Sequence, residues 1–141
     1  METLFNEIQK RIADNTPALS LIDEDYGQLD FAEDQYPVTF PCVLISAPQV
    51  AWNNFMDRTQ KGSATITTRL AIDCYADTHY GSTQENQAAT RMKIASDLNK
   101  LLQCYKFESA QGPMVRISSR SYSLQGGIKV YEATYQVNVV D

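Results

Sequence analysis

The sequence predicts an α+β protein in which an antiparallel sheet of about four to five strands carries an N-terminal helix and one long helix. Three observations predict this class: period-two alternation over residues 63–76, a helical apolar stripe over 83–104, and two alternating runs joined by a Gly-Gly pair. The chain has 141 residues, which is a typical length for one domain. We therefore expect a single α+β domain over residues 1–141.

The N-terminal residues 2–14 predict a short amphipathic helix. Its apolar side chains recur at helical spacing: Leu4, Phe5, Ile8 and Ile12. Pro17 follows shortly after, and proline disfavours the helical conformation for the residue before it. The helix should therefore end near Asn15.

The next segment is expected to combine a polar loop with a buried strand. Residues 19–22 begin a short strand or an extended segment, and 23–36 are rich in acidic and amide side chains. We expect a mobile loop over 23–36, anchored by Leu29 and Phe31. The short, nearly continuous apolar run 41–47 then predicts a buried strand.

Residues 48–62 predict a long mobile loop or a hairpin arm, and the clearest strand follows. Over 63–76, one face should be apolar and the other largely polar, as in a half-buried antiparallel strand. The expected apolar positions are Ala64, Ile66, Thr68, Leu70, Ile72 and Cys74.

The C-terminal half predicts the long helix and a β-hairpin. Ser82 and Glu85 have the spacing of a capping box before the helix 83–104. The expected apolar stripe of this helix is Ala88, Met92, Ala95, Leu98 and Leu102. Strands over 114–124 and 128–140 should pair through a turn that contains Gly126 and Gly127, since glycine accepts positive φ at little cost.

Composition excludes several classes of protein. The formal net charge is -5 and the pI about 4.8, with basic residues scattered along the chain, so we expect no sequence-specific nucleic-acid binding. The acidic run Asp23-Glu24-Asp25 is interpreted as a solvated turn. Three widely spaced cysteines predict neither a disulfide framework nor a zinc site. With no signal-peptide pattern and no membrane-spanning stretch, we expect a cytoplasmic chain without membrane contact.

The sequence offers little catalytic chemistry. The single histidine, His79, could act as a general base beside Asp77, but it lies in a turn without a placed nucleophile. Cys74 lies in an apolar alternation, where a thiol lacks the base and the lowered pKa that reactivity needs. We predict a protein that is not an enzyme and that uses no cofactor and no metal.

Two features invite a functional interpretation. Trp52, Phe55 and Met56 are apolar side chains in a polar segment and form a candidate partner-binding loop; the alternative is a lid that folds onto the core. The second feature is a set of candidate subunit-interface positions on the C-terminal strands, where a sheet can continue into another subunit. These outward positions are Arg116, Arg120, Glu132 and Gln136. An ordinary solvated face is the alternative.

The order of elements and several segments resemble the phage tail terminator and tail-completion family of the minor tail protein U type. The segments are the N-terminal helix, Asp25-Tyr26-Gly27-Gln28-Leu29, residues 37–47, Gly62 with its strand ending at 73–77, the long helix and the C-terminal hairpin. The resemblance implies a non-catalytic subunit that forms a ring, typically of six copies.

That ring would cap the tail tube and join it to the head connector of a phage or prophage. The implied partners are other copies of the chain, the tail-tube protein and the head–tail connector. The implied location is the bacterial host cytoplasm during assembly and then the virion tail. The alternative function is a small cytoplasmic ligand-binding or adaptor domain with a pocket between the long helix and the sheet.

Overall fold

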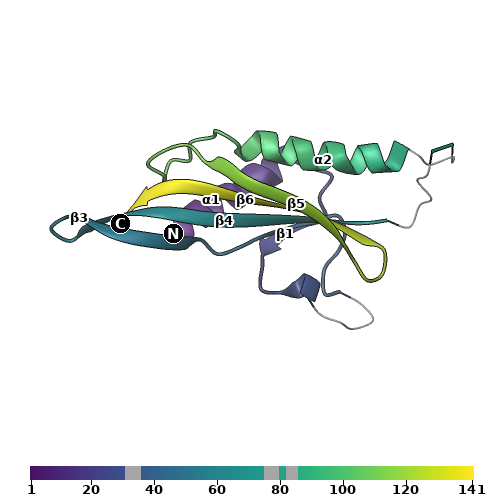
Figure 1. Cartoon of the computed structure of the whole chain (residues 1–141), viewed down its shortest axis with the longest axis horizontal. Coiled ribbons are helices and arrows are strands. Elements are labelled where there is room, and N and C mark those ends of the chain that lie inside the picture. Colours follow the sequence, from purple (N-terminus) through teal and green to yellow (C-terminus); the bar gives the residue numbers. More distant parts are fainter. Residues whose placement is uncertain (31–35, 75–79, 82–85) are drawn as a thin grey trace.

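The computed structural model describes residues 1–30, 36–74, 80–81 and 86–141 and confirms the α+β class (Figure 1). Two helices, a short 3-10 helix and six strands follow one another along the described chain. In chain order they are α1 (Glu2–Asn15), β1 (Leu21–Glu24), η1 (Gln28–Asp30), β2 (Cys42–Ile45), β3 (Gln49–Met56), β4 (Thr59–Asp73), α2 (Asn86–Leu102), β5 (Val115–Leu124) and β6 (Ile128–Val140).

The described strands form one mostly antiparallel sheet with the order β1-β2-β4-β6-β5, and β3 pairs with β4 beside this path. The sheet thus has six strands, where four to five were expected. The short segment after Ser20 is a true strand, and it pairs with β2 in parallel, from Leu21 with Cys42 to Glu24 with Ile45. The other pairs are antiparallel.

Strand β4 is the central element of the sheet. One of its edges pairs with β6 continuously, from Lys61 opposite Val140 to Asp73 opposite Ile128. Its other edge pairs with β3 over its first half and with β2 over its second half. Because both edges are occupied, backbone pairing fixes the position of every neighbouring strand.

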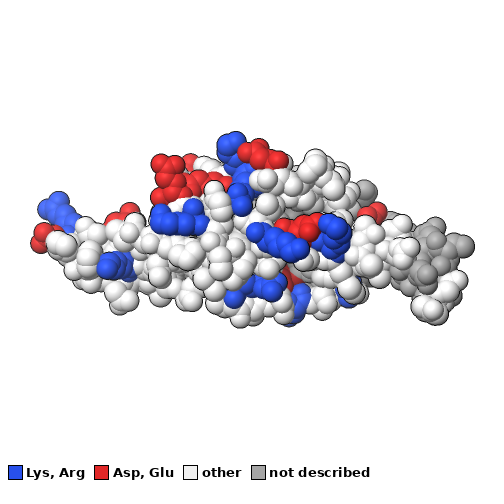
Figure 2. Space-filling view, turned by 90° about the horizontal axis from the view of Figure 1, so that it is seen from above, with Lys and Arg blue, Asp and Glu red and all other residues white. Residues whose placement is uncertain are grey.

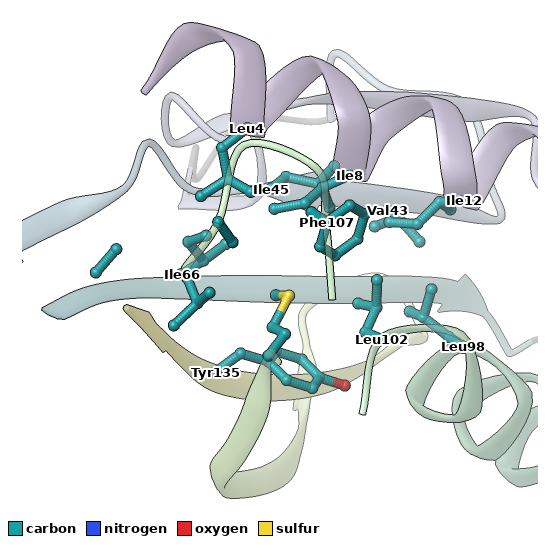
Figure 3. Close-up of a cluster of buried hydrophobic side chains, with 14 of the residues drawn as sticks. Leu4, Ile8, Ile12, Val43, Ile45, Ile66, Leu98, Leu102, Phe107 and Tyr135 are labelled. Carbon is teal, nitrogen blue, oxygen red and sulfur yellow. The ribbon is translucent and has the colours of Figure 1, made fainter. Parts of the chain in front are cut away.

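Both helices cover the same face of the sheet, which we call the helix face. Leu4, Ile8 and Ile12 of α1 are fully buried, as the sequence predicted. They belong to the same cluster as Leu98 and Leu102 of α2 and reach the strand side chains between the helices (Figure 3). The sheet contributes the expected alternate positions to this cluster: Ala64, Ile66, Leu70, Ile72, Tyr135, Val137 and Val139.

The opposite face, which we call the loop face, is also buried at one end, and this corrects the expectation of a polar second face on β4. Leu29, Cys42, Leu44 and Ala71 form a second cluster with Ile128 and Val130. Leu29 is the loop anchor that the sequence predicted. The partner anchor Phe31 lies outside the described residues.

The expected solvated acidic turn is partly wrong, because Asp25 forms a buried ion pair on the loop face. The Arg69 Nε and Nη2 atoms donate to the two Asp25 carboxylate oxygens at 2.7 Å and 2.8 Å. The side chains are only 11% and 15% exposed. Arg69 also donates to Asp30 at 3.3 Å. The pair fastens the segment between β1 and η1 across β4, so residues 25–30 are ordered by a charge on a distant strand.

Helix α2 buries a narrower stripe than predicted. Leu98 and Leu102 are buried, but Met92 is 60% exposed. About two turns before Leu98, the inward position is Arg91, whose Nε is buried without a hydrogen-bond partner among the described residues. Arg91 thus takes the inward place that the predicted apolar stripe gave to Met92. The aliphatic stem of an arginine can line apolar surface in this way. The proposed capping residues Ser82 and Glu85 lie outside the described residues.

The Asp25→Asn variant should lose about 3 kcal/mol of unfolding free energy near neutral pH. The substitution removes the buried carboxylate that Arg69 pairs with and leaves the guanidinium only the more distant and exposed Asp30. This costs far more than losing a surface pair. Denaturant unfolding followed by circular dichroism measures the loss. Asp14→Asn is the matched control, because Asp14 pairs with Lys10 on the exposed surface of α1, and it should change stability by well under 1 kcal/mol.

The stability gap between the native chain and Asp25→Asn should close in acid. Burial opposes the charged form of Asp25, but hydrogen bonds from Arg69 and the Gly27 amide hold the pKa of this carboxyl below its ordinary value of 3.8. The contribution is therefore complete above the unfolded-state pKa and disappears as pH falls through the lower folded-state pKa. A gap that stays constant down to the acid transition would show that the ion pair does not stabilise the fold.

Candidate functional site

The described residues present surfaces rather than a reactive centre. They contain no cluster of three or more His, Cys, Asp or Glu side chains that could hold a metal. Burial raises the pKa of the Cys42 thiol to about 11, so it is protonated at neutral pH. Among the described helices, none combines the length and apolarity that a membrane crossing requires. His79 and Asp77 lie outside the described residues.

Residues 48–62 form a regular β-hairpin arm, so the hairpin alternative was correct and the loop alternative was not. Strand β3 pairs with the start of β4 from Gln49 opposite Thr65 to Met56 opposite Thr59. Asp57 and Arg58 make the turn, and Asp57 adopts a φ of 48°. A positive φ suits a two-residue hairpin turn, and aspartate accepts it better than most residues. The arm projects beyond the other strands at one end of the molecule (Figure 1).

The three predicted residues of this arm lie in two different environments. Trp52 is half-buried and packs against the main core cluster at the base of the arm. It lies over Gly62 on the paired strand, where an added Cβ would approach Trp52 Cε3 to 2.7 Å and Val50 Cγ1 to 2.5 Å. Glycine at position 62 is therefore required by the close approach of the indole ring.

At the tip of the arm, apolar side chains are exposed. Phe55 is 50% exposed and Met56 is 60% exposed. Phe55 lies in an irregularity of the strand pairing between Asn54 and Met56. The Lys61 ammonium lies 3.7 Å from the Phe55 ring centroid, so it covers one side of the ring. The sequence grouped Trp52 with these two residues, but the structure brings only Phe55 and Met56 to the free end.

A groove of about 460 Å³ runs between α2 and the β5–β6 hairpin on the helix face. Four elements line it. The lining residues are Thr68 and Leu70 of β4, Tyr131, Glu132, Ala133 and Tyr135 of β6, Ala95, Ser96, Leu98 and Asn99 of α2, and Arg116, Ser119, Arg120 and Ser121 of β5. The serines of β5 are small and exposed. Because α2 covers β4 and β6 but not this serine-rich strand, a hollow remains between helix and strand.

Tyr135 fixes the inner wall of the groove. Its ring is buried, and burial raises the pKa of its hydroxyl to about 12. The hydroxyl donates a hydrogen bond of 2.7 Å to Asn99 Oδ1 of α2. The neutral phenol thus ties the helix to β6 at a set separation, which keeps the groove open.

The four predicted strand positions do not share one face, which corrects the sequence interpretation. The pairing of β5 with β6 shifts between Arg116 and Ser118, leaving Ile117 as an extra residue. Such a bulge reverses the alternation of side chains. Arg116 therefore lies opposite Tyr135 on the helix face, whereas Arg120 lies opposite Glu132 on the loop face.

On the loop face, the other predicted positions have partners within the chain. Arg120 Nε donates to Glu132 at 2.5 Å, and the Tyr122 hydroxyl donates to the same carboxylate at 3.4 Å. Gln136 donates to the Ser63 hydroxyl at 2.7 Å. Arg116 differs from them, because its guanidinium has no carboxylate partner among the described residues. It lines the groove, as Arg120 and Glu132 also do.

Strand β5 leaves one edge of the sheet open. Its backbone pairs with β6 on one side, and on the other side the Arg116 amide is met by Gln103 of the α2 C-terminus. Val115 and Ile117 are exposed on this strand. Seen from above, basic and acidic side chains are interspersed, and no continuous basic stripe crosses this face (Figure 2).

The sequence did not predict the Arg69–Asp25 pair, and it predicted a pocket between the long helix and the sheet only under the alternative function, without naming its residues. One signal was available for the pair: Arg69 is a charged residue directly before the apolar run Leu70, Ala71 and Ile72. The groove had a weaker signal, the serines at alternate positions 119, 121 and 123 of β5. Their meaning depends on where α2 lies, which local pattern does not give.

Comparison with known proteins finds a likeness in fold only. No family model matches the chain, and no curated protein matches it. Among solved structures, the chain is similar to a chain of a structure titled "Virion of native gene transfer agent (GTA) particle". The alignment has a TM-score of 0.65 and 9% sequence identity, and it covers 96% of this chain and 93% of the other. The two chains share a fold over nearly their whole lengths.

The Gly62→Ala variant should be destabilised by about 2 kcal/mol, because the new methyl group forces the Trp52 ring off the strand. Trp52 is the only tryptophan, so its fluorescence reports the displacement directly as a shift to longer wavelength. Gly112→Ala is the matched control, since a Cβ there meets nothing within 4 Å. Unchanged emission and stability in Gly62→Ala would contradict the packing of Trp52 on the arm.

Proposed function

We propose that the chain is a structural subunit of a phage or prophage-derived virion and acts without catalysis. The observation that carries this proposal is the whole-length likeness to a chain of the gene transfer agent virion, with 96% and 93% coverage. Coverage of this extent in both directions means that the likeness involves the complete arrangement of helices and strands and not one common substructure. Fold alone does not determine function, so the surfaces of the chain provide the second support.

Within the virion, we propose the role of a tail terminator or tail-completion subunit. The resemblance in chain order, from the N-terminal helix to the C-terminal hairpin, supports this finer assignment. In this role, copies of the chain form a ring, with six copies as the family's usual number. One side of the ring covers the growing end of the tail tube, and the other meets the head–tail connector.

The shape of the chain suits such a ring. It has an arm with exposed apolar residues at one end and an open strand edge and groove elsewhere on the sheet. Two different surfaces on one chain allow head-to-tail contacts, and these close into a ring when the rotation between copies permits. A subunit with one self-complementary patch would instead stop at a dimer.

The charge of the chain also suits a channel for DNA. The formal net charge is -5, so a ring of identical copies multiplies a negative charge. A predominantly acidic lumen repels passing DNA and prevents the ring from binding its cargo. A ring structure with a basic lumen would contradict this part of the proposal.

A second candidate function, a small ligand-binding or adaptor domain, is favoured by the groove. Its volume of about 460 Å³ lies within the range of small-molecule sites, and Tyr131, Tyr135 and Arg116 give it aromatic and polar walls. In that case the isolated chain should bind a small molecule. A thermal-shift screen in which no compound raises the melting temperature of the chain would disfavour this candidate.

Deleting the coding sequence from the phage or prophage that carries it should abolish infectious or DNA-transferring particles. Without a terminator, tail tubes grow to irregular lengths and do not join filled heads, and electron micrographs of induced lysates show both defects. Complementation with the native chain should restore tails of uniform length. Normal particles in the deletion strain would overturn the proposed function.

A further inference from the structure

The arm tip and the groove are complementary surfaces that a single chain cannot bring together. The tip carries two exposed apolar side chains, Phe55 and Met56, next to the carboxylate of Asp57. The arm projects at one end of the molecule (Figure 1). The groove is lined by α2 together with β4, β5 and β6. Since β4 is rigidly paired along both edges, the arm cannot fold back into the groove of its own chain.

We propose that the arm tip of one copy, residues 55–58, occupies the groove between α2 and the β5–β6 hairpin of a second copy. This inference rests on the proposed function, because it names the contact through which the ring is built. The occupant is the arm of another copy and not a small molecule or a different protein.

Apolar matching is the first argument for this occupant. The groove floor is formed by Leu70, Leu98 and Ala133 with the Tyr135 ring. Phe55 and Met56 are exposed at the free end of a hairpin, and burying two such side chains removes substantial apolar surface from water. Aromatic and methionine anchors that fill a pocket are typical centres of protein interfaces.

Charge matching is the second argument. Arg116 lines the groove, and its guanidinium has no carboxylate partner among the described residues. Arg120 and Glu132 also line the groove, but they are paired with each other. Asp57 lies at the arm turn between the apolar pair and Arg58, and none of the ion pairs among the described residues includes its carboxylate. Seating Phe55 and Met56 in the groove would bring Asp57 to the Arg116 side of the mouth, where opposite charges fix the register.

The geometry of the contact determines which kind of assembly it builds. Each copy offers one arm and one groove, so the contact is head-to-tail and every copy inside an assembly uses both surfaces. Such a contact generates a closed ring or an open filament, according to the rotation between copies. The chain should therefore not stop at a symmetric dimer through this contact.

Charge exchange tests the contact. Asp57→Arg and Arg116→Asp, each alone, should weaken self-association about tenfold or more, because each places like charges at the mouth of the groove. The two variants mixed in equal amounts should associate with each other, and the double variant should recover most of the native mass. The measurement is light scattering over a concentration series. The matched control is Asp14→Arg, which changes charge equally on the exposed surface of α1 and should associate like the native chain.

Cysteine cross-linking gives an independent readout. In a background with the exposed Cys104 replaced by Ser, Met56→Cys combined with Ser119→Cys should form disulfide-linked ladders under mild oxidation. The control pair, Met92→Cys with Ser119→Cys, should not, because Met92 is exposed on α2 outside the groove lining. Circular dichroism of each variant checks that the fold is retained.

The outcomes separate this contact from the proposed function. If the native chain assembles but the charge variants do so equally well and no ladder forms, the arm–groove contact is overturned while the ring remains. If a small molecule binds the groove and no ladder forms even in its absence, the groove is a ligand site and the contact is overturned as well. A chain that stays monomeric and unlinked overturns the contact, and the deletion phenotype then decides the virion role separately.

Discussion

The fold depends on the pairing of β4 along both of its edges. This strand runs from Thr59 to Asp73, pairs with β6 over almost its whole length and divides its other edge between β3 and β2. A strand held in this way cannot change register without moving its apolar side chains to the wrong face. Both core clusters are therefore positioned by one element. The first half of β4 forms the arm with β3, and the second half lies between the two buried faces.

The two halves of β4 differ in how far they are covered, because the helices on one face and residues 25–30 on the other do not extend over the whole strand. Helices α1 and α2 cover the helix face, and residues 25–30 are held on the loop face by the Arg69–Asp25 pair. Past that covered region, the sheet continues as a hairpin with Trp52 packed at its base and Phe55 and Met56 exposed at its tip. A buried charge pair is not in itself a source of stability. Here it determines where the loop lies and hence which part of the sheet is left uncovered.

Local pattern was enough to predict the elements, because their periodicity is set by burial on one side. Residues 128–140 alternate as a half-buried strand should, and β6 has these bounds. Leu4, Ile8 and Ile12 were correctly placed in the core. Burial on the second face could not be predicted, since Arg69 meets a carboxylate 44 residues away. The bulge at Ile117 was also invisible, and it moved Arg116 to the opposite face from Arg120. For the candidate site, the sequence left open whether Trp52, Phe55 and Met56 are exposed or fold onto the core, and the structure divides them between the two. The groove arises from the placement of α2 over the sheet.

The proposed self-assembly at the tail relies on the projecting arm and the groove together. Electron cryomicroscopy of the purified particles tests it most directly, because the map shows where the chain lies and which surfaces meet. We expect a closed ring of this chain at the head-proximal end of the tail, with the tip at residues 55–58 of each copy in the groove of its neighbour. Particles that lack the chain, or that hold it as single copies without contact between them, would contradict the claim.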